Sequence, residues 1–173
     1  MRRSIHSALI LPLLVLGVSA LASAPADAQR VASWSISAGV VRYDLAETGT
    51  APAGTLRLEV PVTRTVLLEP GIMVAYPNQD VGRQWIVLPQ AIVQYRLSPG
   101  ASVEPYLGGG AGLALGFEDE GASEVDILLT GAVGARIGTA SPIGFVIDAR
   151  AHAIGFDADA SLFELTLGLR FSR

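Results

Sequence analysis

The chain has 173 residues, half of them hydrophobic, with 12 arginines, 16 acidic residues, no lysine and no cysteine. The acidic balance argues against nucleic acid as a partner. The lack of cysteine excludes disulfides, thiolate catalysis and thiolate metal sites.

The first 28 residues have the pattern of a secretory signal peptide. Met1-Arg2-Arg3 is basic, residues 8–22 are apolar, and Ala26-Asp27-Ala28 matches a cleavage site. A membrane anchor is the alternative, but the apolar run is short and contains Pro12. We expect cleavage after Ala28, which leaves one domain over residues 29–173 with 10 arginines, 15 acidic residues and a net charge of −5.

Eight segments of the mature chain alternate between apolar and polar residues. Strand side chains have a period of two, so such segments are expected to be strands with one apolar face. In the last of them, Phe163, Leu165, Leu167, Leu169 and Phe171 share one face. The predicted strands are residues 33–44, 54–61, 66–76, 85–96, 103–117, 124–137, 143–154 and 163–171.

The connections between these segments alternate in length and polarity. Residues 61–65, 97–102 and 138–142 are short, whereas residues 45–53, 77–84, 118–123 and 155–160 are mostly longer and more polar. Short periplasmic turns alternating with longer outer loops are typical of outer-membrane barrels, and an even strand number returns both termini to the periplasm. Since only helices and closed barrels satisfy their backbone in lipid, the sequence predicts an eight-stranded antiparallel up-and-down transmembrane β-barrel.

Aromatic residues lie near the ends of the predicted strands, as in a membrane-interface girdle. The expected periplasmic set is Trp34, Tyr95, Phe145 and Phe171, and the outer set is Tyr76, Trp85 and Phe117. A soluble periplasmic barrel that binds an apolar ligand is an alternative source of alternation. The glycines and single charges on the polar face, and the bulk of the apolar face, favour the membrane barrel.

Two segments resemble a known group of proteins. Residues 104–113, Glu-Pro-Tyr-Leu-Gly-Gly-Gly-Ala-Gly-Leu, are similar to a Pro-Tyr-x-Gly-x-Gly-x-Gly strand of small outer-membrane barrels of the OmpA/OmpW-like group. The strand ending at Phe171 resembles their C-terminal signal, although Ser172 and Arg173 follow it. The resemblance implies an outer-membrane location, contact with lipid and lipopolysaccharide, and recognition of this strand by the barrel assembly machinery. Members of the group differ in activity.

The polar face of the predicted barrel carries many charges, and an eight-stranded barrel is just wide enough for side chains to fill it. We expect a lumen of arginine–carboxylate pairs, with a narrow ion or solute pore as the alternative. The predicted network comprises Arg57, Glu59, Glu69, Arg96, Glu104, Asp126, Arg136, Asp148, Arg150, His152, Glu164 and Arg170.

His152 is the single histidine of the mature chain and a possible general base. Its strand resembles part of the lipid A deacylases, whose pattern needs a serine two residues after the histidine, where this chain has Ile154. We therefore expect no enzyme and no catalytic residue, with a lipid A-modifying outer-membrane enzyme as the alternative. A lone histidine also gives no transition-metal site, and we expect no cofactor. Acidic residues of the predicted outer loops are interpreted as solvated surface, with Ca²⁺ or Mg²⁺ binding as the alternative.

Overall fold

The computed structural model describes residues 33–44, 48–77, 85–117, 123–155 and 161–172. The chain divides into the units Met1–Arg30 and Val31–Arg173. The predicted signal peptide, its cleavage site at Ala28 and most acidic residues of the predicted outer loops lie outside the described residues. In the described part, no helix is long and apolar enough to cross a membrane.

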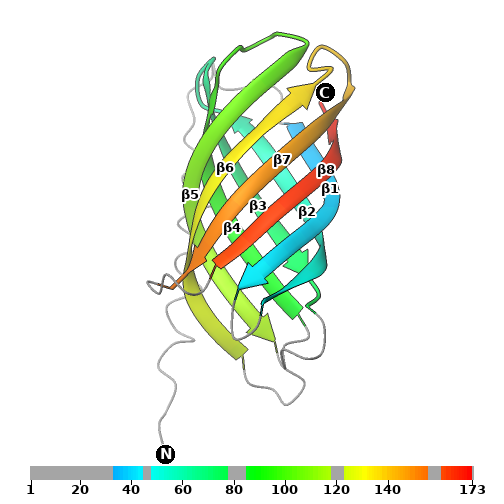
Figure 1. Ribbon diagram of the computed structural model, residues 1–173. Coiled ribbons are helices and arrows are strands. Elements are labelled where there is room, and N and C mark those ends of the chain that lie inside the picture. Colours follow the sequence, from blue (N-terminus) through cyan, green and yellow to red (C-terminus); the bar gives the residue numbers. More distant parts are fainter. Residues whose placement is uncertain (1–32, 45–47, 78–84, 118–122, 156–160, 173) are drawn as a thin grey trace, which may run out of the picture. The chain divides into compact units, whose positions relative to one another are not determined.

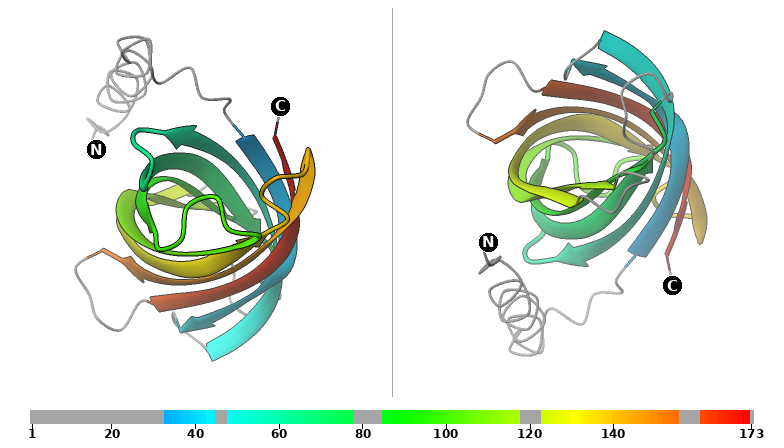
Figure 2. Two further views of the ribbon diagram at one scale, coloured as in Figure 1. Left: turned by 90° about the horizontal axis from the view of Figure 1, so that it is seen from above. Right: turned by 90° about the horizontal axis from the view of Figure 1, so that it is seen from below.

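Eight strands form one closed antiparallel barrel. Each strand pairs with its neighbours in the chain, and β1 also pairs with β8, which closes the ring (Figures 1 and 2). The predicted eight-stranded up-and-down barrel is thereby confirmed. The strands are β1 Ser33–Asp44, β2 Thr48–Pro61, β3 Val66–Ala75, β4 Trp85–Arg96, β5 Val103–Phe117, β6 Ser123–Ile137, β7 Ile143–Ile154 and β8 Ser161–Phe171.

Four predicted strand limits were wrong, one of them substantially. Strand β2 begins at Thr48 rather than at residue 54, because residues 48–53 pair with β1 out to Asp44. Glycine, alanine and proline in this stretch gave it the composition of a loop, but antiparallel pairing with β1 overrides that composition. The other three differences are one or two residues: β3 ends at Ala75, β6 starts at Ser123 and β8 starts at Ser161.

The barrel has two distinct ends. The turn end holds the start of β1, the end of β8 and the short connections 62–65, 97–102 and 138–142. In these connections Gly100 and Gly138 adopt positive φ angles of 85° and 74°. At the loop end, residues 45–47, 76–84, 118–122 and 155–160 connect the strands. At the turn end of the β1–β8 pairing that closes the ring, Trp34 stacks on Phe171 with ring centroids 4.2 Å apart.

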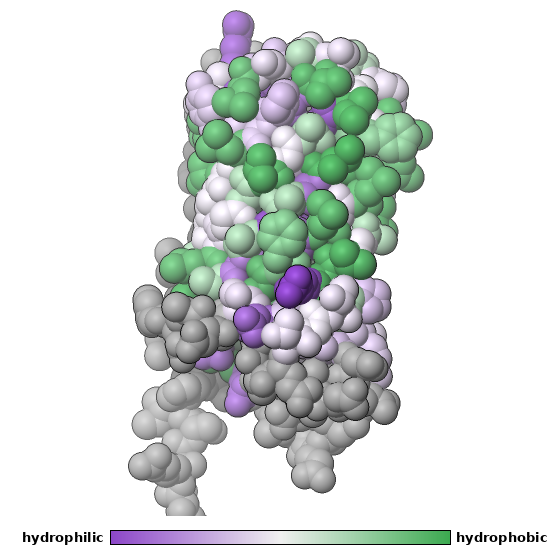
Figure 3. Space-filling model, in the orientation of Figure 1, coloured by the Kyte–Doolittle hydropathy of each residue, from purple (hydrophilic) through white to green (hydrophobic). Residues whose placement is uncertain are grey.

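The outward wall of the barrel is apolar. Large hydrophobic side chains that point away from the lumen are exposed, among them Ile36, Val93, Leu107 and Leu167. Hydrophobic residues cover much of the face seen in Figure 3. The predicted outer aromatics Tyr76 and Trp85 meet edge to face near the loop end, with ring centroids 4.9 Å apart. Such a belt, with aromatic rings at its borders, suits a hydrocarbon surrounding.

The lumen is filled by two different kinds of side chain. Its turn-end half is polar, as predicted, but its loop-end half is an apolar cluster that the sequence reasoning missed. Successive inward residues change character within one step, as at Leu88 to Gln90 on β4 and Leu128 to Thr130 on β6. The apolar cluster comprises Val41, Tyr43, Ala51, Ala53, Met73, Ala75, Ile86, Leu88, Ala114, Leu128, Ile154 and Leu162.

Glycine is required where neighbouring strands approach closely. A Cβ atom at Gly110 would overlap the carbonyl oxygen of Ala91 and lie 2.7 Å from Cα of Ile92, both on backbone that cannot yield. At Gly131, in contrast, a Cβ atom would meet nothing within 4 Å.

We expect Gly110→Ala to lower the free energy of unfolding by about 1–3 kcal/mol, because the added methyl group overpacks the wall. Gly131→Ala is the matched control and should leave stability unchanged or slightly raised. Urea unfolding of the refolded barrel, followed by its heat-modifiable mobility on gels, measures both variants. Equal urea midpoints for the two would contradict the packing argument.

Candidate functional site in the barrel lumen

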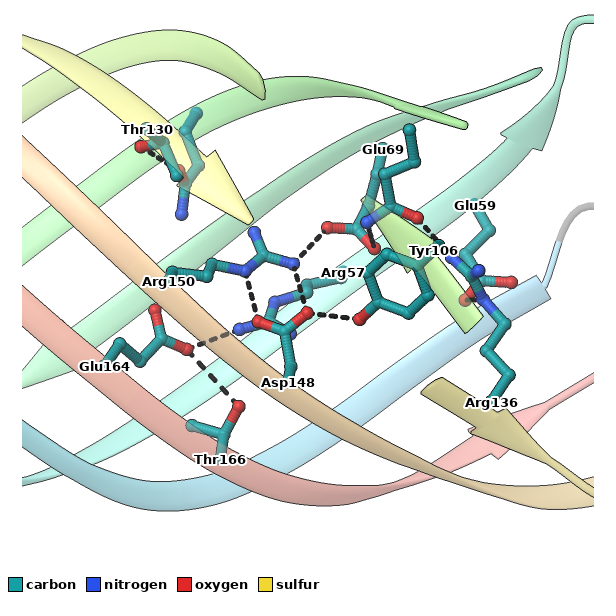
Figure 4. Close-up of polar contacts among 12 residues, drawn as sticks. Arg57, Glu59, Glu69, Tyr106, Thr130, Arg136, Asp148, Arg150, Glu164 and Thr166 are labelled. Carbon is teal, nitrogen blue, oxygen red and sulfur yellow. Dashed lines mark hydrogen bonds and ion pairs between the residues drawn. The ribbon is translucent and has the colours of Figure 1, made fainter. Parts of the chain in front are cut away.

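The centre of the polar lumen is a cluster of charges around Asp148. Arg150 Nε donates to Asp148 Oδ1 at 2.5 Å, and Arg57 Nη1 lies 3.2 Å from the same oxygen. The hydroxyl group of Tyr106 donates to Asp148 Oδ2 (Figure 4). Asp148 has no exposed surface. A buried carboxylate is tolerated when donors satisfy its oxygens, and here two guanidinium groups and one phenol surround it.

Ion pairs tie together strands on opposite sides of the ring. Arg150 on β7 donates to Glu69 on β3 at 2.6 Å. Arg136 on β6 donates through Nε to Glu59 on β2 at 2.7 Å. The members of each pair stand four strands apart in a ring of eight, so these contacts cross the lumen. The guanidinium fork reaches across this width and still binds its carboxylate.

The turn end of the network shares two carboxylates among three arginines. Glu59 accepts from Arg136 and also from Arg170 Nε at 2.8 Å. Glu104 lies 3.5 Å from Arg96 Nη1 and 3.7 Å from Arg136 Nη1. The guanidinium carbon of Arg136 also stands 4.2 Å from the ring centroid of Tyr106, a cation–π contact.

Gln94 joins the turn-end cluster to the central one. Its side-chain oxygen accepts from Arg136 Nη2, and its Nε2 donates to Glu69 Oε2 at 2.8 Å. Glu164 accepts from Arg57, so it belongs to the central cluster as well. Eleven of the twelve predicted residues therefore lie in one connected lumen network, in which five arginines face five carboxylates.

Asp126 is the exception, and its predicted place in the network was wrong. It points to the same side of β6 as Arg136 but stands at the exposed loop end, beyond the apolar residue Leu128. Among the described residues it forms no ion pair with the network. Alternation along a strand determines the face of a residue but not its depth, which is why the sequence placed Asp126 inside.

His152 lies where the polar half meets the apolar cluster. Its Nδ1 is 2.9 Å from the hydroxyl oxygen of Thr130, and its Nε2 is 3.1 Å from Glu164 Oε2. Thr130 also donates to Gln90 Oε1 at 2.8 Å. Hydroxyl, imidazole and carboxylate thus line up in the order of a nucleophile–base–acid triad, which the sequence reasoning missed because these residues come from three strands.

This triad-like arrangement is enclosed. Thr130 is 5% exposed, His152 2% and Glu164 0%, and the apolar cluster covers it on the loop-end side. A nucleophile must reach the substrate atom that it attacks, and this hydroxyl group is already engaged by Gln90. The geometry therefore serves to satisfy buried polar groups.

Removing one member of the central cluster should be costly, because its partners would remain buried and unpaired. We expect Asp148→Ala to lower the free energy of unfolding by about 3–5 kcal/mol, since Arg57 and Arg150 lose a shared counter-charge. Asp126→Ala removes an exposed carboxylate on the same inward-facing side and should change stability by less than about 0.5 kcal/mol. Urea unfolding in one detergent compares the two variants. Similar losses of unfolding free energy would contradict a stabilising role of the buried network.

Comparisons with known proteins identify the fold. No family model matches the sequence, and no curated protein matches it. Among solved structures, Neisserial surface protein A is similar with a TM-score of 0.69 and 12% identity over 83% of this chain and 97% of its own. The N-terminal β-barrel domain of Pseudomonas aeruginosa OprF gives 0.61 and 16% over 82% and 97%, and Ail of Yersinia pestis gives 0.53 and 17% over 83% and 99%. This chain therefore has the fold of small outer-membrane β-barrels.

Proposed function

We propose that the protein is an outer-membrane barrel with a closed lumen, which acts through its outward wall and outer loops in a structural or surface-interaction role. The observation that carries the proposal is the double filling of the lumen. A connected ion-pair network occupies the turn-end half, and the apolar cluster occupies the loop-end half. In the described part of the barrel, the inward side chains of both halves are mostly buried against one another.

The outward wall supports a membrane location. Bulky apolar side chains face outward and most charged ones face the lumen, which is the reverse of a soluble barrel that holds an apolar ligand. The N-terminal segment with its expected cleavage after Ala28 supports export, and the solved structures of similar fold come from outer-membrane proteins. The proposal includes contact with lipid and lipopolysaccharide and recognition of the strand ending at Phe171 by the assembly machinery.

The pore alternative is disfavoured by the apolar cluster. An ion that entered from the turn end would meet arginine–carboxylate pairs and then a layer of buried apolar residues such as Met73, Leu88 and Leu128. Moving a charge into such a layer without partners is strongly unfavourable. The enzyme alternative is disfavoured by the enclosure of His152 and Thr130 in the lumen.

Fractionation tests the location. We expect the protein in the outer-membrane fraction, with a gel mobility that changes on heating because a folded barrel resists unfolding by detergent. Recovery in the soluble periplasmic fraction, without heat-modifiable mobility, would refute the membrane barrel.

Conductance tests the closed lumen. After reconstitution into a planar lipid bilayer, the protein should give no discrete current steps over a range of voltages, because the apolar cluster blocks ions. A general porin prepared in the same way serves as the positive control. Reproducible single-channel steps from the purified protein would overturn the closed-lumen proposal and favour the pore.

A further inference from the structure

The outward wall is hollowed over strands β8, β1, β2 and β3. This groove has a volume of about 870 Å³. Its floor is made of small residues, because Ala38 on β1 pairs with Gly54 on β2. Larger side chains such as Leu56, Ile72 and Leu167 form its sides, and the aromatic pair Tyr76 and Trp85 stands at its loop-end border.

The chemistry of the groove fits a hydrocarbon chain. A Cβ atom at Gly54 would meet nothing within 4 Å, so the floor there is open space. The side chains that line the groove offer almost exclusively apolar atoms, which give water no hydrogen-bonding partners. In a wall that faces lipid, an acyl chain is the group that can fill such a hollow without losing hydrogen bonds.

A single cation stands beside the loop end of the groove. Arg42 is exposed on the outward face of β1 and pairs with Thr50, two residues from Pro52 in the groove lining. It is the only arginine in the described strands that projects outward. An outward arginine is expensive within hydrocarbon, so Arg42 belongs at the headgroup level. Asp44 lies two residues further out, where it accepts a hydrogen bond from Thr48 at 3.0 Å.

We propose that this groove and Arg42 form a binding site for a phosphorylated, multiply acylated glycolipid, the lipid A part of lipopolysaccharide. One acyl chain lies over Gly54, and a phosphate group binds the Arg42 guanidinium by a charge-assisted hydrogen bond. The loop end faces the outer leaflet in the proposed orientation, which selects lipopolysaccharide over inner-leaflet phospholipids. The inference rests on the proposed function and adds to it a defined site for lipopolysaccharide on the outward wall.

Native mass spectrometry of the refolded mature chain in detergent tests the site. Heat-modifiable mobility, which does not depend on this lipid, first verifies that each variant is folded. Purified lipid A is then titrated against the wild type, Gly54→Phe, Arg42→Gln and the control Gly131→Phe. Gly131 also faces outward with open space at its Cβ, but it lies on β6, outside the groove.

The wild type and Gly131→Phe should bind one lipid A with affinities within about twofold of each other. Gly54→Phe fills the groove and should weaken binding at least about tenfold, a difference of about 1.4 kcal/mol. Arg42→Gln should weaken binding of lipid A by a similar factor. Its affinity for dephosphorylated lipid A should equal that of the wild type.

Three results would overturn the inference. Equal affinities for Gly54→Phe and Gly131→Phe would show that the groove is not the site. Unchanged lipid A binding by Arg42→Gln would remove the phosphate contact. Equal binding of phosphatidylglycerol and lipid A would show a general phospholipid site. None of these results would affect the membrane location, whose own test is fractionation.

Discussion

The pairing of β1 with β8 is the contact on which the rest of the structure depends. It runs from Trp34 opposite Phe171 to Asp44 opposite Ser161, and it removes the two free edges that an open sheet would have. A closed ring satisfies its backbone internally, so its outer wall can be wholly apolar. A ring of eight strands is also narrow, so its inward side chains must fill the interior themselves. The apolar outer wall and the packed lumen are therefore both consequences of the closed ring of eight strands.

A lumen packed with charges is tolerable only because the charges are shared. Asp148 and Glu59 each form ion pairs with two arginines. Gln94 connects the turn-end cluster to the central one by hydrogen bonds to both. Pairs such as Arg150 with Glu69 also cross the ring, so they resist its flattening as well as balancing charge. The same sharing makes the network vulnerable, since one missing carboxylate leaves several buried donors without a partner.

Alternation along the chain is enough to predict the strands, the two faces of each strand and most of the charged residues that face the lumen. It does so because the side chains of a strand repeat with a period of two. It is not enough to predict depth or partners. Asp126 has the right face but lies at the exposed end, and Thr130 meets His152 and Gln90 only through the register of β4, β6 and β7. The apolar cluster did leave a signal, in inward-facing Val41, Met73 and Leu88, but an expectation of a polar lumen concealed it. Extension of β2 to Thr48 depended on its partner strand rather than on its own composition.

The fold requires glycine at some strand positions and only allows it at others. At Gly39 and Gly110 the backbone of the adjacent strand occupies the place of a side chain, so closure itself demands glycine. At Gly54 and Gly131 no atom stands in the way, and a strand residue with higher β-propensity would fit. Packing therefore gives no reason for glycine at Gly54, whose missing side chain leaves part of the groove open beside its partner Ala38. This concave part of the outward wall is therefore the place where we propose that the barrel receives a lipid.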